Sequence, residues 1–578
     1  MPHRPSRRAG SASEKGELPM KTNGAQLITR LLERQGITTI PGIPGGASLP
    51  LYDALRASTI RHVLARHEQG AGFIAQGMAR ASGRPAVCFG TSGPGATNLL
   101  TAIADAKLDS IPLVAVTGQV PRAMIGTDAF QEIDTYGLTI PITKHNFLVR
   151  SAAELLEVIP DAFRIAASGR PGPVVIDVPK DVQNEPIEID ALPEPGTADP
   201  PPRFSDDDIA RAAALINQAR RPVLLIGAGI IAANASSDLR RLADKASIPV
   251  AATLLGLGAL PHDHPLFLGM IGMHAARFTN LLLEECDLLI GLGVRFDDRA
   301  TGKVAEFCPR AKILHIDIDP SELGKIKQPT LGIVADVGQA LRALDPRVAA
   351  TSRCEWVQRM ATLRALHPLA MPGADDPSRP YGIVRHTAAL VPDDSVITTD
   401  VGQHQMWAAQ AYPLTRPRQW LTSGGLGTMG FGLPAAIGAA LAEPSRAVVC
   451  FSGDGSLLMN LQELATAAEE NVNVKVILLN NAHLGLVRQQ QQLFYGERFH
   501  ASRFRAEPDF AAIARGFGIT AYDLGTAANP LATLTRALGE PGPCLVNVPI
   551  AADENVYPMV APGGANRDMI GGESHARI

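Results

Sequence analysis

The stretch Ser452-Gly453-Asp454-Gly455-Ser456, followed further along the chain by Asn480-Asn481, decides how this sequence is interpreted. A short apolar run, 447–451, precedes the first group, and a second apolar run, 474–479, precedes the two asparagines. Short apolar runs of this kind predict buried strands of a parallel sheet. Ligands of such sheets bind outside the carboxyl ends of the strands, so both polar groups are expected at one edge of the sheet.

The residue types in these two groups indicate a metal that holds phosphates. Mg²⁺ prefers oxygen ligands and usually keeps phosphate oxygens in its coordination shell. Asp454 and Asn481 can supply two such oxygens, and a helix predicted over 459–468 would point its N-terminus at the phosphates. The alternative is an ordinary strand-turn-helix in which glycine only permits the turn.

Composition favours small-molecule chemistry. The chain has 578 residues, enough for about three to four domains. Charged residues make up 19% and the formal net charge is −4, so no basic face is expected to bind nucleic acid. The six cysteines form no CxxC pair, which is typical of reduced thiols in a cytoplasmic protein. No apolar run approaches the roughly 18 residues that would cross a membrane.

Two proline-rich seams divide the chain. We predict a disordered extension over 1–20, since this stretch has arginines but no hydrophobic core, and Glu14 and Glu17 argue against a transit peptide. The remaining divisions are a first domain at 21–185, a linker at 186–202, a second domain at 203–345, a linker at 346–380, a third domain at 381–555 and a tail at 556–578. Each domain alternates apolar strands with helical stretches, which predicts an α/β fold with doubly wound parallel sheets.

Two features of the first domain are ambiguous by themselves. Glu68 opens a predicted helix that runs through Ala81, where an acidic side chain could simply favour the helix dipole. The glycine-rich turn 91–96 follows a predicted strand and would bring backbone amides close to a ligand. Many α/β proteins have such a turn.

The second domain contains Gly227-Ala228-Gly229 after an apolar strand, a match to the G-x-G-x-x-A dinucleotide fingerprint. An acidic residue should then end the following strand, but 249–253 has none. We therefore do not expect an ordinary NAD-linked dehydrogenase. Polar residues do end two later strands, at 295–299 and 317–319, which favours a nucleotide lying across several strand ends.

Taken together, these segments resemble the catalytic subunit of the acetohydroxyacid synthase family, also called acetolactate synthases, from about residue 21 to the C-terminal region. The Gly-Asp-Gly to Asn-Asn pattern resembles the signature for thiamin diphosphate (ThDP) binding. The other matching stretches are RHEQGAGFIAQGMAR (66–80), TSGPGATNLLTAIADAKLDSIPL (91–113), GQVPRAMIGTDAFQE (118–132), SGRPGPVVIDVPKDVQ (168–183), GVRFDDRATGK (293–303), TDVGQHQMWAAQ (399–410) and GGLGTMGFGLPAAIGA (424–439).

The resemblance implies three α/β domains, of which the first binds the pyrimidine of ThDP, the second binds FAD and the third binds the diphosphate with Mg²⁺. It implies a transferase that decarboxylates pyruvate and joins the two-carbon unit to a second pyruvate or to 2-ketobutyrate, the first common step of isoleucine and valine biosynthesis. Active sites of the family lie between the first domain of one subunit and the third of another. A homodimer or larger assembly is therefore expected, together with a small regulatory subunit.

The resemblance also assigns roles to single residues. Glu68 is expected to share a proton with the pyrimidine ring, Arg299 to hold the carboxylate of the second ketoacid, and Gln131 and Lys180 to line the approach to the thiazolium. Gln403 and His404 would contact the ThDP diphosphate, Met429 would support its bent shape, and the backbone carbonyl of His483 would be the third metal ligand. The remaining residues expected around ThDP are Gly427, Gly455 and Ser456.

FAD is expected as a structural cofactor, because the reaction has no net redox step. The residues expected to contact it are Arg170, Thr253, Leu254, Gly272, Met273, His274, Gly293, Arg295, Asp297, Asp317, Ile318, Asp336 and Val337.

Gln490 stands where many members of the family have the Trp that favours 2-ketobutyrate, so we expect weak discrimination between the two ketoacids, as in the isozyme I type. Phe130 is a second candidate for selectivity, and a surface position for Gln490 is the alternative. Glyoxylate carboligase and pyruvate oxidase remain alternative functions. Glu68 argues against the first, while the 2-ketoacid decarboxylases lack the Arg-Phe-Asp-Asp-Arg segment. A non-catalytic flavoprotein would have no use for Asp454 and Asn481.

Overall fold

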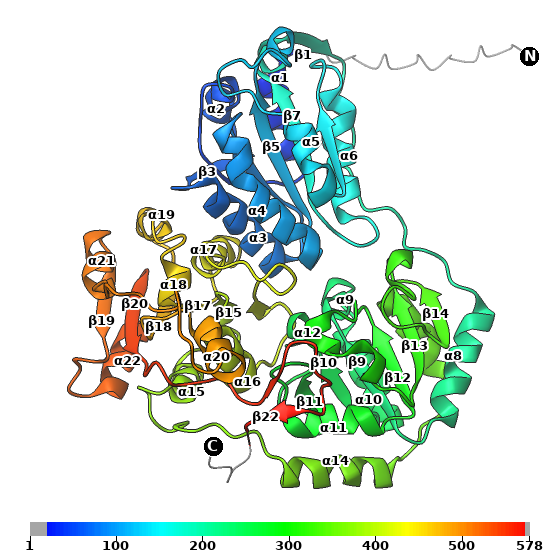
Figure 1. The fold of residues 1–578 in the computed structure, drawn as a ribbon. Coiled ribbons are helices and arrows are strands. Elements are labelled where there is room, and N and C mark those ends of the chain that lie inside the picture. The colour runs from blue at the N-terminus through cyan, green and yellow to red at the C-terminus, as the bar shows by residue number, and fades with distance from the viewer. Residues whose placement is uncertain (1–19, 573–578) are drawn as a thin grey trace, which may run out of the picture.

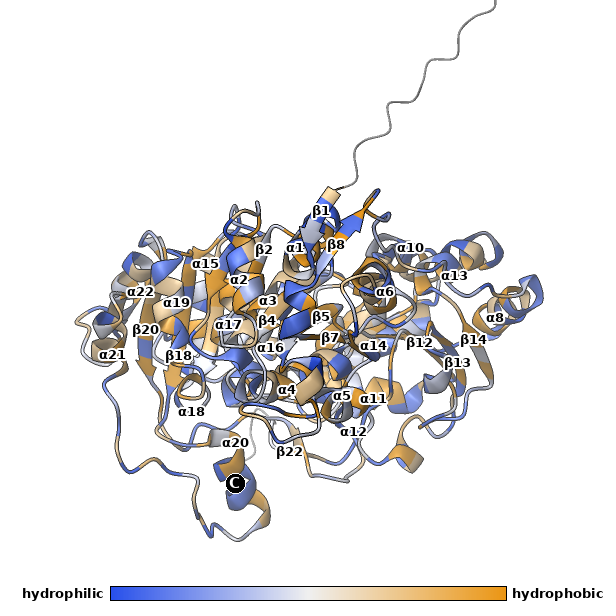
Figure 2. Ribbon diagram, turned by 90° about the horizontal axis from the view of Figure 1, so that it is seen from above, coloured by the Kyte–Doolittle hydropathy of each residue, from blue (hydrophilic) through white to orange (hydrophobic). Residues whose placement is uncertain are grey.

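A computed structural model describes residues 20–572, so most of the predicted N-terminal extension, 1–19, lies outside the described residues. The chain forms three α/β lobes, each built on a parallel sheet of six strands (Figure 1). The strands of these sheets are mostly hydrophobic, while the helices around them carry mixed faces (Figure 2). The predicted fold class is confirmed.

The first sheet has the strand order β3-β2-β4-β5-β7-β6. Its strands are β2 Thr39–Gly42, β3 Arg61–Leu64, β4 Ala86–Gly90, β5 Leu113–Gln119, β6 His145–Leu148 and β7 Val174–Pro179. Its helices are α1 Gly24–Arg34, α2 Leu49–Leu55, α3 Glu68–Ser82, α4 Pro94–Asp109, α5 Thr135–Thr139, α6 Leu155–Ala167 and α7 Lys180–Asn184.

The second sheet has the order β11-β10-β9-β12-β13-β14. Its strands are β9 Pro222–Ile226, β10 Val250–Ala252, β11 Phe267–Met270, β12 Leu288–Leu292, β13 Lys312–Asp317 and β14 Leu331–Val334. Its helices are α8 Asp206–Gln218, α9 Ala228–Ala232, α10 Ser236–Ala246, α11 Arg277–Glu285, α12 Asp298–Thr301 and α13 Val337–Leu344.

The third sheet has the order β16-β15-β17-β18-β20-β19. Its strands are β15 Val396–Thr399, β16 Trp420–Leu421, β17 Val448–Gly453, β18 Val474–Asn480, β19 Thr520–Asp523 and β20 Cys544–Pro549. Its helices are α15 Pro380–Leu390, α16 Gln403–Ala411, α17 Gly432–Ala442, α18 Asp454–Leu457, α19 Glu463–Glu469, α20 Gly485–Phe494, α21 Phe510–Gly516 and α22 Pro530–Gly539.

The segments predicted as extension, linkers and tail contain regular structure. Strand β1, Met20–Asn23, pairs with β8, Pro186–Ile189, in an antiparallel edge where Pro186 is tolerated. Helix α14, Cys354–Leu366, lies inside the predicted linker 346–380 and buries Trp356, whose indole N–H donates to Pro222 O at 2.9 Å. Strands β21, Met559–Val560, and β22, Met569–Ile570, pair inside the predicted tail. The boundaries between domains otherwise stay a prediction.

The tail returns to the second lobe (Figure 1). The backbone N–H of Val560 donates to Met273 O at 2.9 Å, and the side-chain amide of Asn566 donates to Ala300 O at 2.8 Å. A short cluster of buried side chains, Ala275, Val560 and Met569, packs between them. Residues 560–572 therefore pack on the second lobe, whereas Val556 and Tyr557 bond Gln489 and Gln410 of the third lobe.

Helices α3 and α17 join the first and third lobes at very short range. A Cβ added to Gly77 would lie 2.1 Å from Ala435 O, and one added to Gly438 would lie 1.9 Å from Ile74 O. Glu463, fully buried in the third lobe, accepts hydrogen bonds from the backbone N–H groups of Arg66 and His67, both at 3.0 Å. The third lobe therefore fixes the start of the helix on which Glu68 lies.

Asp177, buried in β7, gives the first lobe a testable pH dependence. It accepts hydrogen bonds from Thr117 Oγ1 at 2.7 Å and Gln119 Nε2 at 3.0 Å, and burial raises its pKa to about 7. An unfolded chain releases this proton near pH 3.9, so the stabilising contribution is present below about pH 4 and is lost as the pH rises to about 7.

We expect Asp177→Asn to raise the apparent Tm by several degrees at pH 8 and by clearly less at pH 5. The amide has the shape of the carboxylic acid and keeps both positions hydrogen-bonded without titrating. Thermal scans at the two pH values measure this, with the exposed Asp53→Asn as control. An equal gain at both pH values would show that Asp177 does not titrate in this way.

Candidate functional site

Asp454 and Asn481 come together at the carboxyl edge of the third sheet. Strands β17 and β18 pair in parallel, with Gly453 opposite Leu479, so the residues that follow them meet. Burial raises the pKa of Asp454 to about 6, although the backbone N–H groups of Ala482 and His483 stabilise its carboxylate. The side chain of Asn481 accepts from His483 N at 3.0 Å. A divalent cation at this carboxylate would offset its loss of water.

The helix predicted over 459–468 was wrong in its limits. The chain forms the short helix α18 at Asp454–Leu457, then a turn, and then α19 at Glu463–Glu469. Asn460 lies in the turn, where its side-chain amide donates to Gly430 O at 2.7 Å. This bond joins the turn to the segment around Gly430, and the sequence pattern does not reveal it.

Gln403 and His404, at the start of α16, lie beside the Asn480-Asn481 pair. Gln403 Oε1 accepts from Asn481 Nδ2 at 3.1 Å, and a Cβ on Gly485 would lie 1.9 Å from the same oxygen. A Cβ on Gly453 would lie 2.7 Å from His404 Nδ1. His404 Nε2 is buried without a hydrogen-bond partner, and burial lowers the pKa of this imidazole to about 3. The unpartnered Nε2 of His404 can bond a phosphate oxygen, and Gly453 and Gly485 leave no room for a Cβ beside it. Both features fit a diphosphate that is held through Mg²⁺.

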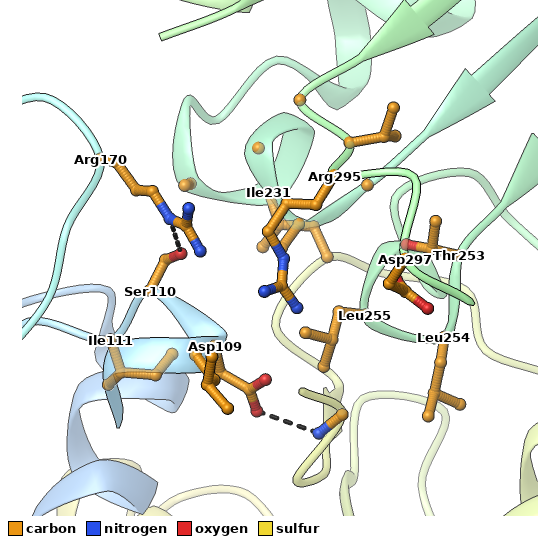
Figure 3. Close-up of a pocket in the computed structure, with 18 of the residues that line it drawn as sticks. Asp109, Ser110, Ile111, Arg170, Ile231, Thr253, Leu254, Leu255, Arg295 and Asp297 are labelled. Carbon is orange, nitrogen blue, oxygen red and sulfur yellow. Dashed lines mark hydrogen bonds between the residues drawn. The ribbon is translucent and has the colours of Figure 1, made fainter. Parts of the chain in front are cut away.

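A cavity of about 640 Å³ lies where the three lobes meet (Figure 3). This volume is within the usual range of about 300–1,000 Å³ for small-molecule sites. Arg170 from the first lobe and Arg295 from the second point toward it, together with Thr253 and Asp297 (Figure 3). The predicted FAD residues that line it are Arg170, Thr253, Leu254, Met273, His274, Gly293, Arg295, Asp297, Asp317, Ile318, Asp336 and Val337.

At the bottom of this cavity the backbone segments pack so closely that only glycine fits, which leaves space for a nucleotide above them. A Cβ on Gly227 would lie 2.1 Å from Gly293 O, which explains the glycine pair at the fingerprint turn. Asp317 ends β13, and burial raises its pKa to about 6. The predicted Gly272 is not among the lining residues; it has φ +94° and packs against Arg299 O. The cavity residues therefore fit FAD, lying across the ends of several strands.

Third-lobe residues extend the same cavity toward the diphosphate site. Gly427, Leu486 and Gln490 line it, as does Arg299 from the second lobe. Gln490 lies on α20 and is partly buried, which argues against the alternative of a surface position. The Arg299 side chain is 64% exposed and pairs with Asp298 at 3.4 Å. Its guanidinium is accessible to a ligand carboxylate.

A separate group gathers in the first lobe. Glu68 is buried, with 8% of the residue exposed, and its carboxylate accepts from Asn98 Nδ2 at 2.9 Å, beside the turn 91–96. Gln131 has φ +61° and lies against Gly93, while Phe130 is 88% exposed. Lys180 begins α7 and is partly buried. None of these four side chains lines the cavity among the residues that the structure describes.

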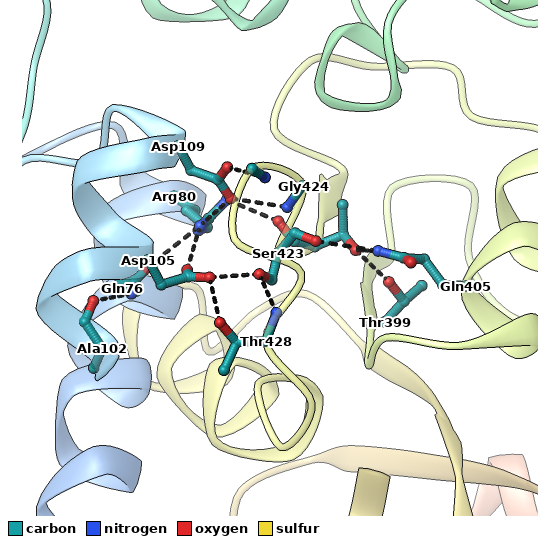
Figure 4. Close-up of polar contacts among 12 residues, drawn as sticks. Gln76, Arg80, Ala102, Asp105, Asp109, Thr399, Gln405, Ser423, Gly424 and Thr428 are labelled. Carbon is teal, nitrogen blue, oxygen red and sulfur yellow. Dashed lines mark hydrogen bonds and ion pairs between the residues drawn. The ribbon is translucent and has the colours of Figure 1, made fainter. Parts of the chain in front are cut away.

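Sequence reasoning missed two further parts of the site. The loop after β2 places Gly45 against Thr91, where a Cβ would lie 2.5 Å from the threonine side chain. The Pro-Gly-Gly turn at 44–46 directly after a strand was the available signal. The second part is a buried ionic cluster of Arg80, Asp105 and Asp109 (Figure 4). No local pattern marks it, because its partners are more than 300 residues away in the chain.

Membrane-spanning helices are not found in residues 20–572, since none of the helices there is both long and apolar enough. Likewise, the described residues contain no cluster of three or more His, Cys, Asp or Glu side chains suited to a metal. The proposed metal site has one carboxylate, one amide and one backbone carbonyl, so such a cluster is not required.

Three family models match the chain in order. They are the thiamine pyrophosphate enzyme N-terminal TPP binding domain at 22–138, the central domain at 209–344 and the C-terminal TPP binding domain at 400–548. The acetolactate synthase isozyme 1 large subunit of Escherichia coli (strain K12) is 61% identical over 549 residues, covering 95% of this chain and 97% of the relative.

Two other relatives agree. The acetolactate synthase large subunit of Parasynechococcus marenigrum (strain WH8102) is 46% identical over 97% of this chain and 92% of its own length. The isozyme 2 large subunit of Escherichia coli (strain K12) is 45% identical over 95% of this chain and 99% of its own length. Since identity at this level extends through all three lobes, the chain belongs to the acetolactate synthase family of thiamine pyrophosphate enzymes.

Proposed function

We propose that this chain is the large, catalytic subunit of an acetolactate synthase, with ThDP, Mg²⁺ and FAD as cofactors. It decarboxylates pyruvate and joins the two-carbon unit to a second pyruvate or to 2-ketobutyrate. The observation that carries this proposal is the cavity that Arg299 and Gln490 both line, together with the residues that fit FAD. A carboxylate-binding guanidinium and a selectivity side chain suit an enzyme that accepts a second ketoacid.

ThDP, when bound, supplies the carbon nucleophile and the electron sink for decarboxylation. Asp454, Asn481 and the His483 carbonyl would hold its diphosphate through Mg²⁺, and Gln403 and His404 would contact the phosphate oxygens. Glu68 would hold a proton at the pyrimidine ring nitrogen. Its place at the N-terminus of α3, with an amide donor at 2.9 Å, keeps the carboxyl in one orientation.

The other residues act on the substrates. Arg299 would bind the carboxylate of the second ketoacid through two parallel hydrogen bonds. Gln131 and Lys180 would border the reacting carbon, and Met429 would support the cofactor from the third lobe. Asp317, Asp336, Arg170 and Arg295 would contact FAD, which supplies no electrons in a reaction without net redox.

The complete site requires two chains in this proposal. Within one chain, the Glu68 group and the Asp454 group lie in different lobes, and Phe130 beside Gln131 is 88% exposed. The first lobe also exposes the apolar side chains of Met124, Ile125, Tyr136 and Leu138, and the third lobe exposes those of Leu426, Leu458 and Met459. Their burial against a second copy would bring Glu68 to the metal site. The relatives' names, "large subunit", also support a smaller regulatory partner.

A cytoplasmic location is part of the proposal. All six cysteines are unpaired, and five of them are buried, as expected for a reducing compartment.

One assay tests the proposed function. The purified protein is incubated with pyruvate, ThDP, Mg²⁺ and FAD, and acetolactate is scored after acid conversion to acetoin. Flavin absorbance is followed in the same cuvette. Product without flavin bleaching supports a carboligase, whereas bleaching in step with pyruvate consumption supports a pyruvate oxidase.

Gln490→Trp is expected to shift competition between the two second substrates toward the 2-ketobutyrate product. An indole adds apolar contact for one methylene, worth about 10 to 200-fold in selectivity. The product ratio from mixed pyruvate and 2-ketobutyrate measures this, and the wild type should give a ratio close to that of the substrates. Gln492→Trp on the same helix is the control, because Gln492 instead bonds Asn555. A wild type that already favours 2-ketobutyrate by tens of fold would assign selectivity to another side chain, such as Phe130.

A further inference from the structure

A glycine-rich loop of the third lobe, 422–430, is held by the buried ionic cluster of the first lobe (Figure 4). Arg80 Nη2 lies 2.8 Å from Asp109 Oδ2 and 3.2 Å from Asp105 Oδ2, and both aspartate side chains are 0% exposed. Arg80 Nη1 donates to Thr422 O at 2.9 Å. The Arg80 guanidinium therefore binds two carboxylates and the first residue of the loop.

Both carboxylates also bind the loop directly. Asp109 Oδ2 accepts from Gly424 N at 3.0 Å and Asp109 Oδ1 accepts from Gly425 N at 2.6 Å. Asp105 Oδ1 accepts from the hydroxyls of Ser423 and Thr428. Since the two glycines have no side chains with which to anchor themselves, their backbone N–H groups are held here by Asp109.

The loop has the flavin cavity on its other side. A Cβ on Gly425 would lie 2.8 Å from Asp109 Oδ1 and 3.1 Å from Arg295 Nη2, so all three lobes touch at this glycine. Asp109, Arg295 and Gly424 all line the cavity. A ligand that orders Arg295 would therefore act on the loop at the position that Asp109 holds.

The far end of the loop reaches the diphosphate site. Asp400 Oδ1 accepts from Gly430 N at 2.7 Å, and Asp400 Oδ2 accepts from Ser452 Oγ at 3.2 Å, two residues before Asp454. Gly427 and Met429, both expected at ThDP, lie between the two anchored ends. A segment of nine residues thus connects the two cofactor sites.

We propose that Asp109 is a positioning residue that couples occupancy of the flavin cavity to the ThDP site through loop 422–430. The inference rests on the proposed function for the identity of the two cofactors. Glycine-rich segments lose much conformational entropy when ordered, so a loop that is already held by Asp109 and by an ordered Arg295 costs less to fix around ThDP. Such coupling gives the flavin a role in a reaction that does not use its electrons.

The test measures FAD affinity in the full-length protein with and without saturating ThDP and Mg²⁺, from the fluorescence of flavin released on dilution. We expect FAD to bind about 10-fold more tightly when ThDP is present, a coupling of ordinary size. Because coupling between two binding sites is reciprocal, FAD affinity reports it as well as ThDP affinity would. Asp109→Asn should reduce this ratio to near one, because an amide can accept from only one of the two glycines. Asp109→Glu should restore part of it, and the exposed Asp53→Asn should keep the wild-type ratio.

Gly425→Ala provides a second test that leaves Asp109 intact. Its methyl group would displace the loop from Asp109 Oδ1 and should also lower the ratio. A wild-type ratio in either correctly folded variant, or no coupling in the wild type, would overturn the proposal. A coupled protein that makes no acetolactate would instead overturn the proposed function, because the binding measurement involves no turnover.

Discussion

Glu68→Gln should lower acetolactate formation by about 10² to 10⁴-fold while leaving ThDP binding nearly unchanged, since general acid-base catalysis contributes rate factors of that size. The amide has the size and shape of the carboxyl, so the hydrogen bond with Asn98 can be kept by rotation of either side chain. What the amide cannot do is exchange a proton with the pyrimidine ring.

The measurement combines steady-state kcat with ThDP affinity by isothermal titration calorimetry. Glu157→Gln, the same change on the exposed face of α6, is the matched control. Activity above about half of the wild-type value would remove Glu68 from the mechanism and leave it only the role of an acidic residue at a helix N-terminus.

Asp454→Ala should abolish ThDP retention at low Mg²⁺. Loss of groups that merely support metal ligands already costs about 10 to 100-fold in affinity, so loss of the one carboxylate ligand should cost more than about 100-fold. The backbone N–H groups of Ala482 and His483 would keep their other acceptors, the side chains of Asn480 and Asn481, so the expected loss is that of the metal ligand.

Gel filtration at low Mg²⁺ followed by assay of bound ThDP gives the result directly. A large excess of Mg²⁺ should restore part of the retention, and Asp393→Ala, an exposed aspartate of the same lobe, should behave as wild type. ThDP affinity that is unchanged in Asp454→Ala at low Mg²⁺ would place the metal site elsewhere.

Strand ends were the most predictable part of this protein. The runs before Asp454, Asn481, Asp317 and the turn 91–96 are short and apolar, so hydrophobicity and β-propensity indicate the same state. The carboxyl edge of each sheet could be predicted from those strands. The residues expected at FAD could be named only after the family resemblance was added.

Contacts between distant parts of the chain were not predictable. Asp109 and Gly424 are separated by 315 positions, and neither belongs to a pattern that would connect them. Helix α14 was missed because the predicted linker was judged from the prolines that follow it, although the helix buries Trp356 against the second lobe. The role of Glu68 came from the family resemblance, whereas the Asp454 and Asn481 site was also indicated by its residue types at two strand ends.

The return of residues 560–572 to the second lobe has a consequence for biosynthesis. Val560 and Asn566 bond Met273 and Ala300, although Asn566 lies 266 positions after Ala300 in the chain. Domains generally fold as units in the order in which they leave the ribosome. The flavin-binding lobe of this protein therefore acquires these contacts only after residues 560–572 have been translated, long after its own sheet has been made.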